Sequence, residues 1–340
     1  MEKVLKQRAE IYGFLALWIM VFHLNTVGIP IPCIPLLTKF IKIGNAGVDV
    51  FFFLSGYCLY LSLSRNSNVC NFFRKRFKRV LLVYLIIAIP FLIYKMAFET
   101  RSNIVFNFFF DLSGLSFWFK HCLNLWFVHA IIVFYLLTIP FFHFIRKGIG
   151  YSIALLLFLY LLNIIGHYYY PLYKEAAIAY TRLPAYVLGM ILADMYSRYH
   201  ITKRFSEHKH LKQCVSIILI LYLIVFLAID VRSAILSRFD PVVIWLTFIT
   251  IIFPVLSLCL VLLGIVGKNN GVSTFLKKTG DLSFEVYMIH ILIMHIFNYQ
   301  GWQSHIGYWS YLIVPLLTFP LSLATNKLAE IISMRLFSPK

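Results

Sequence analysis

Two ionisable side chains lie inside apolar segments near the start of the chain. His23 belongs to the run YGFLALWIMVFHL, and Asp49 belongs to the run GNAGVDVFFFLSG. An ionisable group within a membrane segment is costly, so it marks a candidate functional site. A carboxylate that accepts the imidazole N–H fixes the tautomer of the ring and raises its basicity, as a general base for a hydroxyl nucleophile requires. We therefore predict that Asp49 is the partner of His23 and that both are catalytic.

The alternative for His23 is a buried histidine that is hydrogen-bonded to a neighbouring helix. The other residues on its own segment favour a functional role. Tyr12 is three helical turns before His23 on the same face, and Arg8 is one turn further back. This arrangement suits a ligand that enters from the cytoplasm with an anionic head and reacts deep in the membrane.

A basic cluster, FFRKRFKR, precedes the third apolar segment. Its Arg76 and Arg79 are three residues apart, which places them on one face of an α-helix. Two guanidinium groups on one face suit phosphates, because guanidinium binds phosphate through paired hydrogen bonds. The alternative is a topology signal that contacts anionic lipid.

Further polar residues within apolar segments could line a cavity. Tyr287 and His290 are three residues apart and share a helix face. For Ser55, beside Gly56, the main alternative is close helix packing by small residues. Each of the others, taken singly, has an interhelical hydrogen bond as its simpler explanation. The candidates for the cavity are Ser55, Trp126, Arg182, Tyr287 and His290, with His129, Asp194, Glu285 and His295 as further polar positions.

The elements that must position these residues are membrane-spanning helices. Of the 340 residues, 61% are hydrophobic and only 13% are charged. Apolar runs of about 20 residues recur from end to end, which predicts an all-α, polytopic helix bundle. We expect one integral-membrane domain over 1–340 with no appended soluble domain. The expected spans are 10–29, 46–64, 80–98, 125–144, 150–168, 179–197, 213–230, 241–264, 281–298 and 308–326.

The distribution of basic residues predicts the topology. Of the 31 lysines and arginines, 22 fall in the first set of alternate loops and the two tails. The positive-inside rule then places both termini in the cytoplasm. The net charge of +18 is accordingly assigned to loops, and nucleic acid is not an expected partner. The six cysteines form no CxxC pair, so neither a disulfide framework nor a metal site is expected.

The segment 99–124 is expected on the outer side. It is too polar to span a membrane, yet it is rich in phenylalanine and tryptophan. Such a segment lies at the interface or folds back as a lid, and an ordinary aromatic belt is the alternative.

In several ordered patches the chain resembles the membrane acyltransferase 3 family of bacterial O-acyltransferases. His23 at the end of the first apolar segment matches the family histidine. Where the family has an arginine eleven positions earlier, this chain has Tyr12, and we hypothesise that Arg8 supplies the guanidinium. The other patches are GNAGVDVFFFLSGY at 44–57, FFRKRFKRVLLVY at 72–84, LWFVHAIIVFYLLTIPFF at 125–142, RLPAYVLGMILADM at 182–195 and TGDLSFEVYMIH at 279–290.

The resemblance implies a ten-helix, multi-pass enzyme of the bacterial plasma membrane. It would transfer an acetyl group from cytoplasmic acetyl-CoA to a hydroxyl of a cell-surface or lipid-linked glycan, without a metal. In that setting His23 is the base, Asp49 is its partner, and Arg8, Tyr12, Arg76 and Arg79 bind the CoA moiety. Two alternatives remain: a transporter or flippase of a glycan or acyl compound, and an inactive member of the family.

Overall fold

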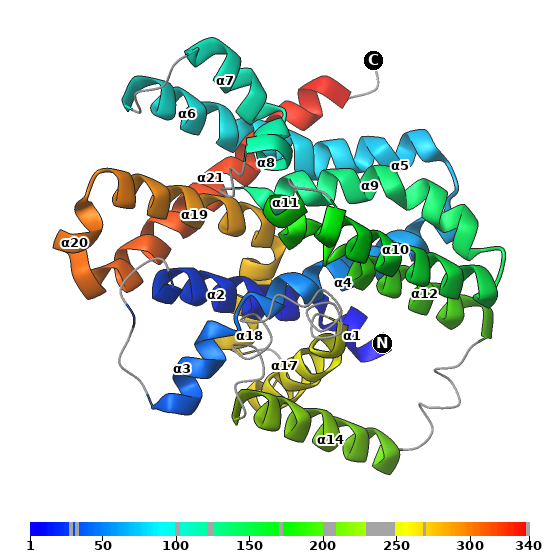
Figure 1. The fold of residues 1–340 in the computed structure, drawn as a ribbon. Coiled ribbons are helices and arrows are strands. Elements are labelled where there is room, and N and C mark those ends of the chain that lie inside the picture. The colour runs from blue at the N-terminus through cyan, green and yellow to red at the C-terminus, as the bar shows by residue number, and fades with distance from the viewer. Residues whose placement is uncertain are drawn as a thin grey trace. The chain divides into compact units, whose positions relative to one another are not determined.

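The computed structural model describes residues 1–26, 30, 34–98, 103–120, 125–169, 173–199, 209–228, 249–267 and 270–337. Within these ranges the regular structure is helical and no strand occurs, so the predicted all-α fold class is confirmed (Figure 1). Seven helices are long and apolar enough to cross a membrane. The count becomes eight if α18 (Gly271–Asp281) and α19 (Ser283–Tyr299), which are bent by 77°, form one broken span.

The predicted spans can be followed onto these helices. Two of them, 213–230 and 241–264, correspond to the shorter apolar helices Gln213–Leu227 and Ile252–Val266. The residues 229–248, which include part of both predicted spans, lie outside the described residues. The chain is therefore a multi-pass membrane protein, while ten spans and cytoplasmic termini stay predictions.

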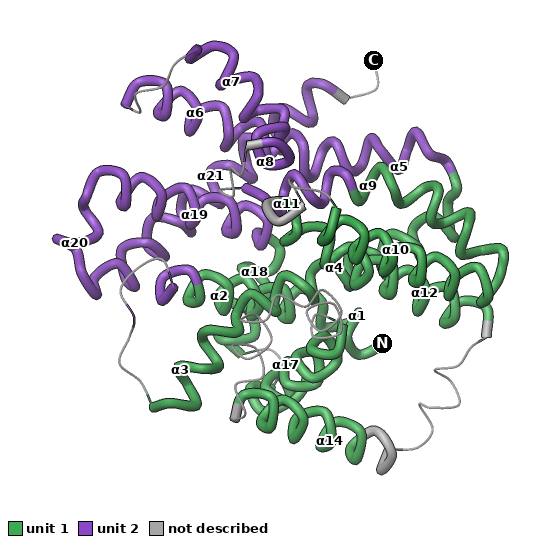
Figure 2. Tube along the Cα trace, in the orientation of Figure 1, with its two compact units in different colours: residues 1–22, 32–67, 134–281 green, residues 23–31, 68–133, 282–340 purple. Residues whose placement is uncertain are grey.

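The chain forms two compact units that interleave along the sequence. Unit 1 comprises residues 1–22, 32–67 and 134–281, and unit 2 comprises residues 23–31, 68–133 and 282–340 (Figure 2). Two helices, α2 (Arg8–Thr26) and α9 (Trp126–Ile145), continue through a unit boundary.

Unit 1 contains most of the apolar helices. Its further helices are α1 (Glu2–Lys6), α3 (Pro35–Lys42), α4 (Ala46–Arg65), α10 (Ile149–Tyr169), α11 (Tyr173–Tyr180), α12 (Leu183–Tyr199), α14 (Lys209–Ala228), α17 (Ile252–Val266) and α18. Apolar side chains of α2, α4, α14 and α17 form one continuous core, with Leu15, Phe53 and Val255 fully buried. The outer face of α10 is apolar instead: Leu157 is 57% exposed and Phe158 is 55% exposed. Such a face is suited to lipid.

The most extensive helix contact described within unit 1 joins α4 to α12. A Cβ added at Gly56 would lie 2.0 Å from the carbonyl oxygen of Tyr186, and one added at Gly189 would lie 2.0 Å from that of Phe53. The two backbones can approach this far only because both positions are glycine. This packing explains why small residues follow the phenylalanine run of α4.

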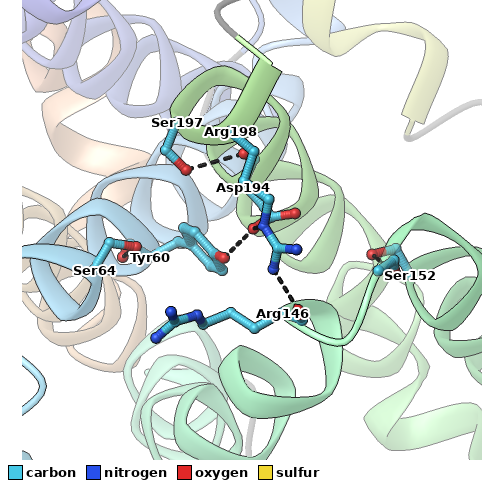
Figure 3. A network of polar contacts seen from close by, with 8 residues as sticks. Tyr60, Ser64, Arg146, Ser152, Asp194, Ser197 and Arg198 are labelled. Atoms are coloured by element: carbon cyan, nitrogen blue, oxygen red, sulfur yellow. Dashed lines mark hydrogen bonds and ion pairs between the residues drawn. The ribbon is translucent and has the colours of Figure 1, made fainter.

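A polar network ties the other end of these two helices together (Figure 3). Asp194 of α12 accepts a short hydrogen bond from the Tyr60 hydroxyl of α4 and forms an ion pair with Arg198 at 2.6 Å. Arg198 also donates to the backbone carbonyl of Arg146, just after α9, at 2.5 Å. Asp194, one of the polar positions within the apolar segments, is therefore paired with Tyr60 on α4 and with Arg198 on its own helix.

Unit 2 is built around α19 and two helices that pack against it. These are α6 (Leu82–Phe98) and α21 (Ser310–Phe337). The remaining elements are α5 (Val69–Arg76), the π-helical segment η1 (Phe77–Leu81), α7 (Ile104–Leu112), α8 (Leu115–Lys120), α20 (Trp302–Ile306) and η2 (Gly307–Trp309). Helix α7 packs against α6 and α8, so the described part of the aromatic segment 99–124 folds back onto the third apolar segment.

We expect the close contact between α4 and α12 to be essential for folding. Replacing Gly56 with alanine inserts a methyl group against a backbone carbonyl that cannot rotate away, so stability should fall by about 1–3 kcal/mol. Thermal unfolding of the purified protein in detergent measures this change. Gly264→Ala on α17 is the matched control, because a Cβ there meets no atom within 4 Å. Equal unfolding temperatures for the two variants would contradict the packing argument.

Candidate active site

Two histidines from distant parts of the chain form a hydrogen-bonded pair in unit 2. Nδ1 of His23, on α2, lies 3.0 Å from Nε2 of His290, on α19. The two rings are 5.2 Å apart between centroids and are inclined by 35°. His290 is fully buried and His23 is partly exposed. Of the two rings, His23 is therefore the one that a ligand can reach.

The partners of His290 determine which nitrogen carries each proton. Nδ1 of His290 lies 2.7 Å from the carbonyl oxygen of Val286, one turn earlier on α19. A carbonyl can only accept, so this Nδ1 carries the proton and, in the neutral ring, Nε2 has the lone pair. Nδ1 of His23 must then donate to that lone pair. In a neutral His23 the lone pair is then on Nε2, the protonation state that a general base requires.

Aromatic residues surround the pair within unit 2. The Tyr287 ring lies 5.9 Å from the His290 ring, edge to face. Phe127 of α9 lies 5.0 Å from the ring of Tyr287, and Trp126 is its buried neighbour. The structure thus brings together four of the predicted site residues: His23, Trp126, Tyr287 and His290.

The predicted pairing of Asp49 with His23 requires correction. Oδ1 of Asp49 lies 2.9 Å from Nε of Arg182, and both side chains are almost completely buried in unit 1. Arg182 also donates to the carbonyl of Ile178 at 2.8 Å. The described hydrogen-bond partner of the His23 ring is His290. The carboxylate has a cation as its partner because a buried charge is stable only when it is paired.

Arg182, which was predicted to line a substrate cavity, contacts Asp49 and the backbone carbonyl of Ile178. It directly precedes α12, whereas Asp49 lies in the first turn of α4, so their ion pair joins the beginnings of these two helices. An acidic residue in the first turn is also favoured by the helix dipole. Ser55, the other predicted cavity residue in unit 1, is partly buried on α4 one residue before the contact at Gly56.

Arg8 and Tyr12 lie together at the start of α2. The guanidinium carbon of Arg8 is 5.9 Å from the centroid of the Tyr12 ring. That ring lies 4.8 Å from the ring of Phe51 on α4 and is tilted by 36° to it. Nη1 of Arg8 lies 3.4 Å from the sulfur of Cys58. The guanidinium therefore lies beside the position at which the family pattern has an arginine, and its role as a replacement for that arginine stays a prediction.

Arg76 and Arg79 do not share a face in the way that the sequence predicted. The prediction assumed an α-helix, but residues Phe77–Leu81 form a π-helical segment, in which the residues are spaced differently around the axis. Arg76 is partly buried and lies 5.7 Å from the ring centroid of Phe72, whereas Arg79 is exposed. Arg79 also interacts electrostatically with buried Glu285 of α19, which accepts a hydrogen bond from Asn326 at 3.2 Å.

Some polar groups of unit 2 were not singled out from the sequence. Nζ of Lys95, on α6, lies 3.3 Å from Oδ2 of Asp111, on α7. The Tyr84 hydroxyl lies 3.2 Å from Nε2 of His129. The sequence did carry a signal for the Lys95–Asp111 pair: a lysine lies within an apolar segment, and an isolated aspartate follows it. We had assigned both residues to ordinary loop and span positions.

The comparisons with known proteins identify the family. The family model described as an acyltransferase domain, of the acyltransferase 3 type, matches residues 13–327. The chain belongs to the acyltransferase 3 family. No curated protein and no solved structure matches it. The matched range contains the His23–His290 pair, the Asp49–Arg182 pair, and Arg76 and Arg79 of the basic cluster, while Arg8 and Tyr12 precede it.

We expect Asp49 of this acyltransferase 3 protein to be required for folding. Asp49→Ala leaves the Arg182 cation buried without its partner, so stability should fall by about 3–5 kcal/mol. The double variant Asp49→Leu/Arg182→Met removes both charges and should recover much of that loss. Thermal unfolding in detergent measures the coupling energy between Asp49 and Arg182. Glu2→Ala, which breaks the exposed ion pair with Lys6, is the control. Additive effects of the two single substitutions would contradict a direct interaction.

Proposed function

We propose that this acyltransferase 3 protein is an O-acetyltransferase of the bacterial plasma membrane. It takes the acetyl group of cytoplasmic acetyl-CoA and transfers it to a hydroxyl of a cell-surface or lipid-linked glycan. Membership of the family supports a membrane acyltransferase. The observation that supports the further step is the chain of hydrogen bonds from Val286 through His290 to His23, which fixes the tautomer of the His23 ring with its lone pair on Nε2.

His23 acts as the general base in this mechanism. Its Nε2 removes the proton from the acceptor hydroxyl as the oxygen attacks the thioester carbonyl of acetyl-CoA. The C–O bond forms, and the carbonyl becomes a tetrahedral oxyanion. His290 holds the His23 ring in the required tautomer by accepting its Nδ1–H, and the Val286 carbonyl holds His290 in turn.

The second half of the reaction returns the proton. The tetrahedral intermediate collapses, the C–S bond breaks, and CoA leaves as its thiolate. The His23 imidazolium then gives its Nε2 proton to the departing sulfur. The products are an acetyl ester and CoA thiol, and both histidines are neutral again. No acyl-enzyme is needed, because the acceptor attacks the thioester directly.

The basic residues of the predicted cytoplasmic side are assigned to the donor. Arg8, next to Tyr12, and the pair Arg76 and Arg79 offer guanidinium groups that suit the phosphates of CoA. Because Arg76 is partly buried and Arg79 is exposed, we assign the two side chains different roles in donor binding. Exposed Arg79 is suited to meet the phosphates, whereas partly buried Arg76 lies against Phe72.

Substitutions in the histidine pair test the mechanism. His23→Ala removes the base and should lower kcat for acetyl transfer by about 10³-fold, within the range for general base catalysis. His290→Ala removes only the orienting group, so we expect a loss of about 10²-fold, mainly in kcat. His290→Gln can still accept the Nδ1–H of His23 and should retain more activity than His290→Ala. Release of CoA thiol from acetyl-CoA by the protein in nanodiscs is the measurement.

His295→Ala is the control for these variants, because His295 lies on the same helix and its ring contacts Phe91. It should remain within a few-fold of the wild type. A His23→Ala protein with unchanged CoA release would refute the base assignment. Transport of a glycan or acyl compound without any thioester cleavage would favour a transporter instead.

Arg8 is expected to determine the affinity for acetyl-CoA. Arg8→Ala removes the guanidinium beside Tyr12, so the Kd for acetyl-CoA should rise about 10-fold, the loss of one charged hydrogen bond. Tyr12→Arg should restore binding in the Arg8→Ala background, because it places an arginine at the position where the family has it. Titration of acetyl-CoA by calorimetry measures both, and Lys6→Ala serves as the control for a nearby positive charge. An unchanged Kd in Arg8→Ala would contradict the hypothesis that Arg8 takes the place of the family arginine.

A further inference from the structure

A small pocket in unit 2 lies apart from the histidine pair. Helices α6, α7 and α8 and the first turn of α9 surround it, and the first three lie together in Figure 2. The free space between the side chains is about 20 Å³, which is enough for one water-sized group. Its polar lining consists of Tyr84, Lys95, Asp111, Ser116 and His129.

Two of these lining groups are buried and have hydrogen-bonding capacity left over. Ser116 is 2% exposed and His129 is 7% exposed. Within the described part of the chain, Oγ of Ser116 and Nδ1 of His129 have no hydrogen-bond partner. Buried polar atoms are almost always satisfied in folded proteins. Two such atoms in the lining of one pocket indicate that the pocket takes a polar guest.

The hydrogen bonds of Tyr84 determine what His129 offers to that guest. The Tyr84 hydroxyl has one proton and donates it to the carbonyl of Leu112 at 2.8 Å. Its oxygen must then accept from His129, so Nε2 of His129 carries the ring proton. Nδ1 of the neutral ring is therefore an acceptor. Ser116 can donate its hydroxyl proton, so the pocket offers one acceptor and one donor.

The charge of the pocket excludes an anionic guest. The Lys95 ammonium lies 3.3 Å from the Asp111 carboxylate, so the only cation and the only anion in the polar lining neutralise each other. The exposed fraction of each side chain is small, at 4% for Lys95 and 12% for Asp111. A neutral group that both donates and accepts a hydrogen bond matches this lining. An alcohol hydroxyl is such a group.

The turn between α7 and α8 is shaped to cover His129. Gly114 has a φ of +79°, and a Cβ there would lie 2.7 Å from Cδ2 of the His129 ring. Phe117, which follows on α8, is fully buried with its ring 6.1 Å from that of His129. The turn therefore holds Ser116 over the pocket, and among the described residues none is hydrogen-bonded to Nδ1 of His129.

We propose that this pocket, formed by Ser116 and His129 with the neutralised Lys95–Asp111 pair, is a recognition subsite for one hydroxyl of a neutral, polyhydroxylated ligand. The ligand hydroxyl donates to Nδ1 of His129 and accepts from Oγ of Ser116. Because α9 carries both His129 and Phe127, and Phe127 contacts Tyr287 beside His290, the same helix borders the pocket and the histidine pair. Resting on the proposed function, the ligand is the glycan acceptor.

Saturation-transfer NMR with the protein in nanodiscs tests the subsite by binding alone. The probes are the methyl glycosides of glucose, galactose and mannose, which are neutral, carry several hydroxyls and do not partition into lipid. At least one should bind to the wild type. Ser116→Ala and His129→Phe, which keeps a ring against Gly114, should each weaken its binding about 10-fold.

Ser113→Ala is the matched control, because the Ser113 hydroxyl donates to the carbonyl of Phe110 at 3.0 Å and does not line the pocket. It should bind like the wild type. The proposal is overturned if no glycoside binds, or if Ser116→Ala binds as well as Ser113→Ala does. Thermal unfolding checks the fold of each variant, and Ser116→Ala decides the matter if His129→Phe does not fold.

The subsite and the proposed function can fail separately. Release of CoA thiol by the wild type tests the function without reference to the pocket. If glycoside binding depends on Ser116 but the protein never releases CoA, the subsite is supported and the proposed transferase function is contradicted. If the protein releases CoA but glycoside binding is unchanged in Ser116→Ala, the transferase function is supported and the subsite is contradicted.

Discussion

Polar side chains in an apolar protein interior have to find partners within the protein, and this constraint explains most of the contacts described above. Water is not available to compensate an unpaired charge in the bilayer core, so each ionisable group is neutral or is held by an opposite charge. Asp49 pairs with Arg182, Lys95 with Asp111, and His23 with His290. The first two pairs combine a cation with an anion. The third joins two neutral rings and places the lone pair of the partly exposed His23 on Nε2.

The histidine pair also shows why a second imidazole can replace a carboxylate as the orienting group. A carboxylate beside His23 would require its own counterion at this depth. A neutral imidazole accepts the same hydrogen bond without adding a charge, and the carbonyl of Val286 fixes its tautomer. The cost is a weaker stabilisation of the imidazolium that forms during the reaction. The proposed mechanism thus combines a weak base, His23, with an orienting residue, His290, whose Nδ1 is hydrogen-bonded to a backbone carbonyl.

The fold class could be predicted from the sequence, because apolar runs of spanning length leave few alternatives to helices. His23, Tyr287 and His290 were found for the same reason, since polar residues in such runs are conspicuous. The partners could not be predicted. Asp49 and His23 lie on consecutive apolar segments of the sequence, yet each pairs with a residue more than 130 positions away, and only tertiary packing selects that residue. The prediction that Arg76 and Arg79 share one face of an α-helix was wrong, because a π-helical segment follows Arg76. The local sequence carries no clear signal for such a segment.

The central claim is that Nε2 of His23 is an unprotonated base, held so by His290. Solid-state NMR of the ¹⁵N-histidine-labelled protein in bilayers tests this directly, with the signals of the two rings assigned by comparison with His23→Ala and His290→Ala. The account predicts that Nδ1 is protonated and Nε2 is unprotonated in both rings, and that the His23 Nδ1 signal shifts when His290 is replaced. A proton on Nε2 of His23 in the neutral protein would contradict it.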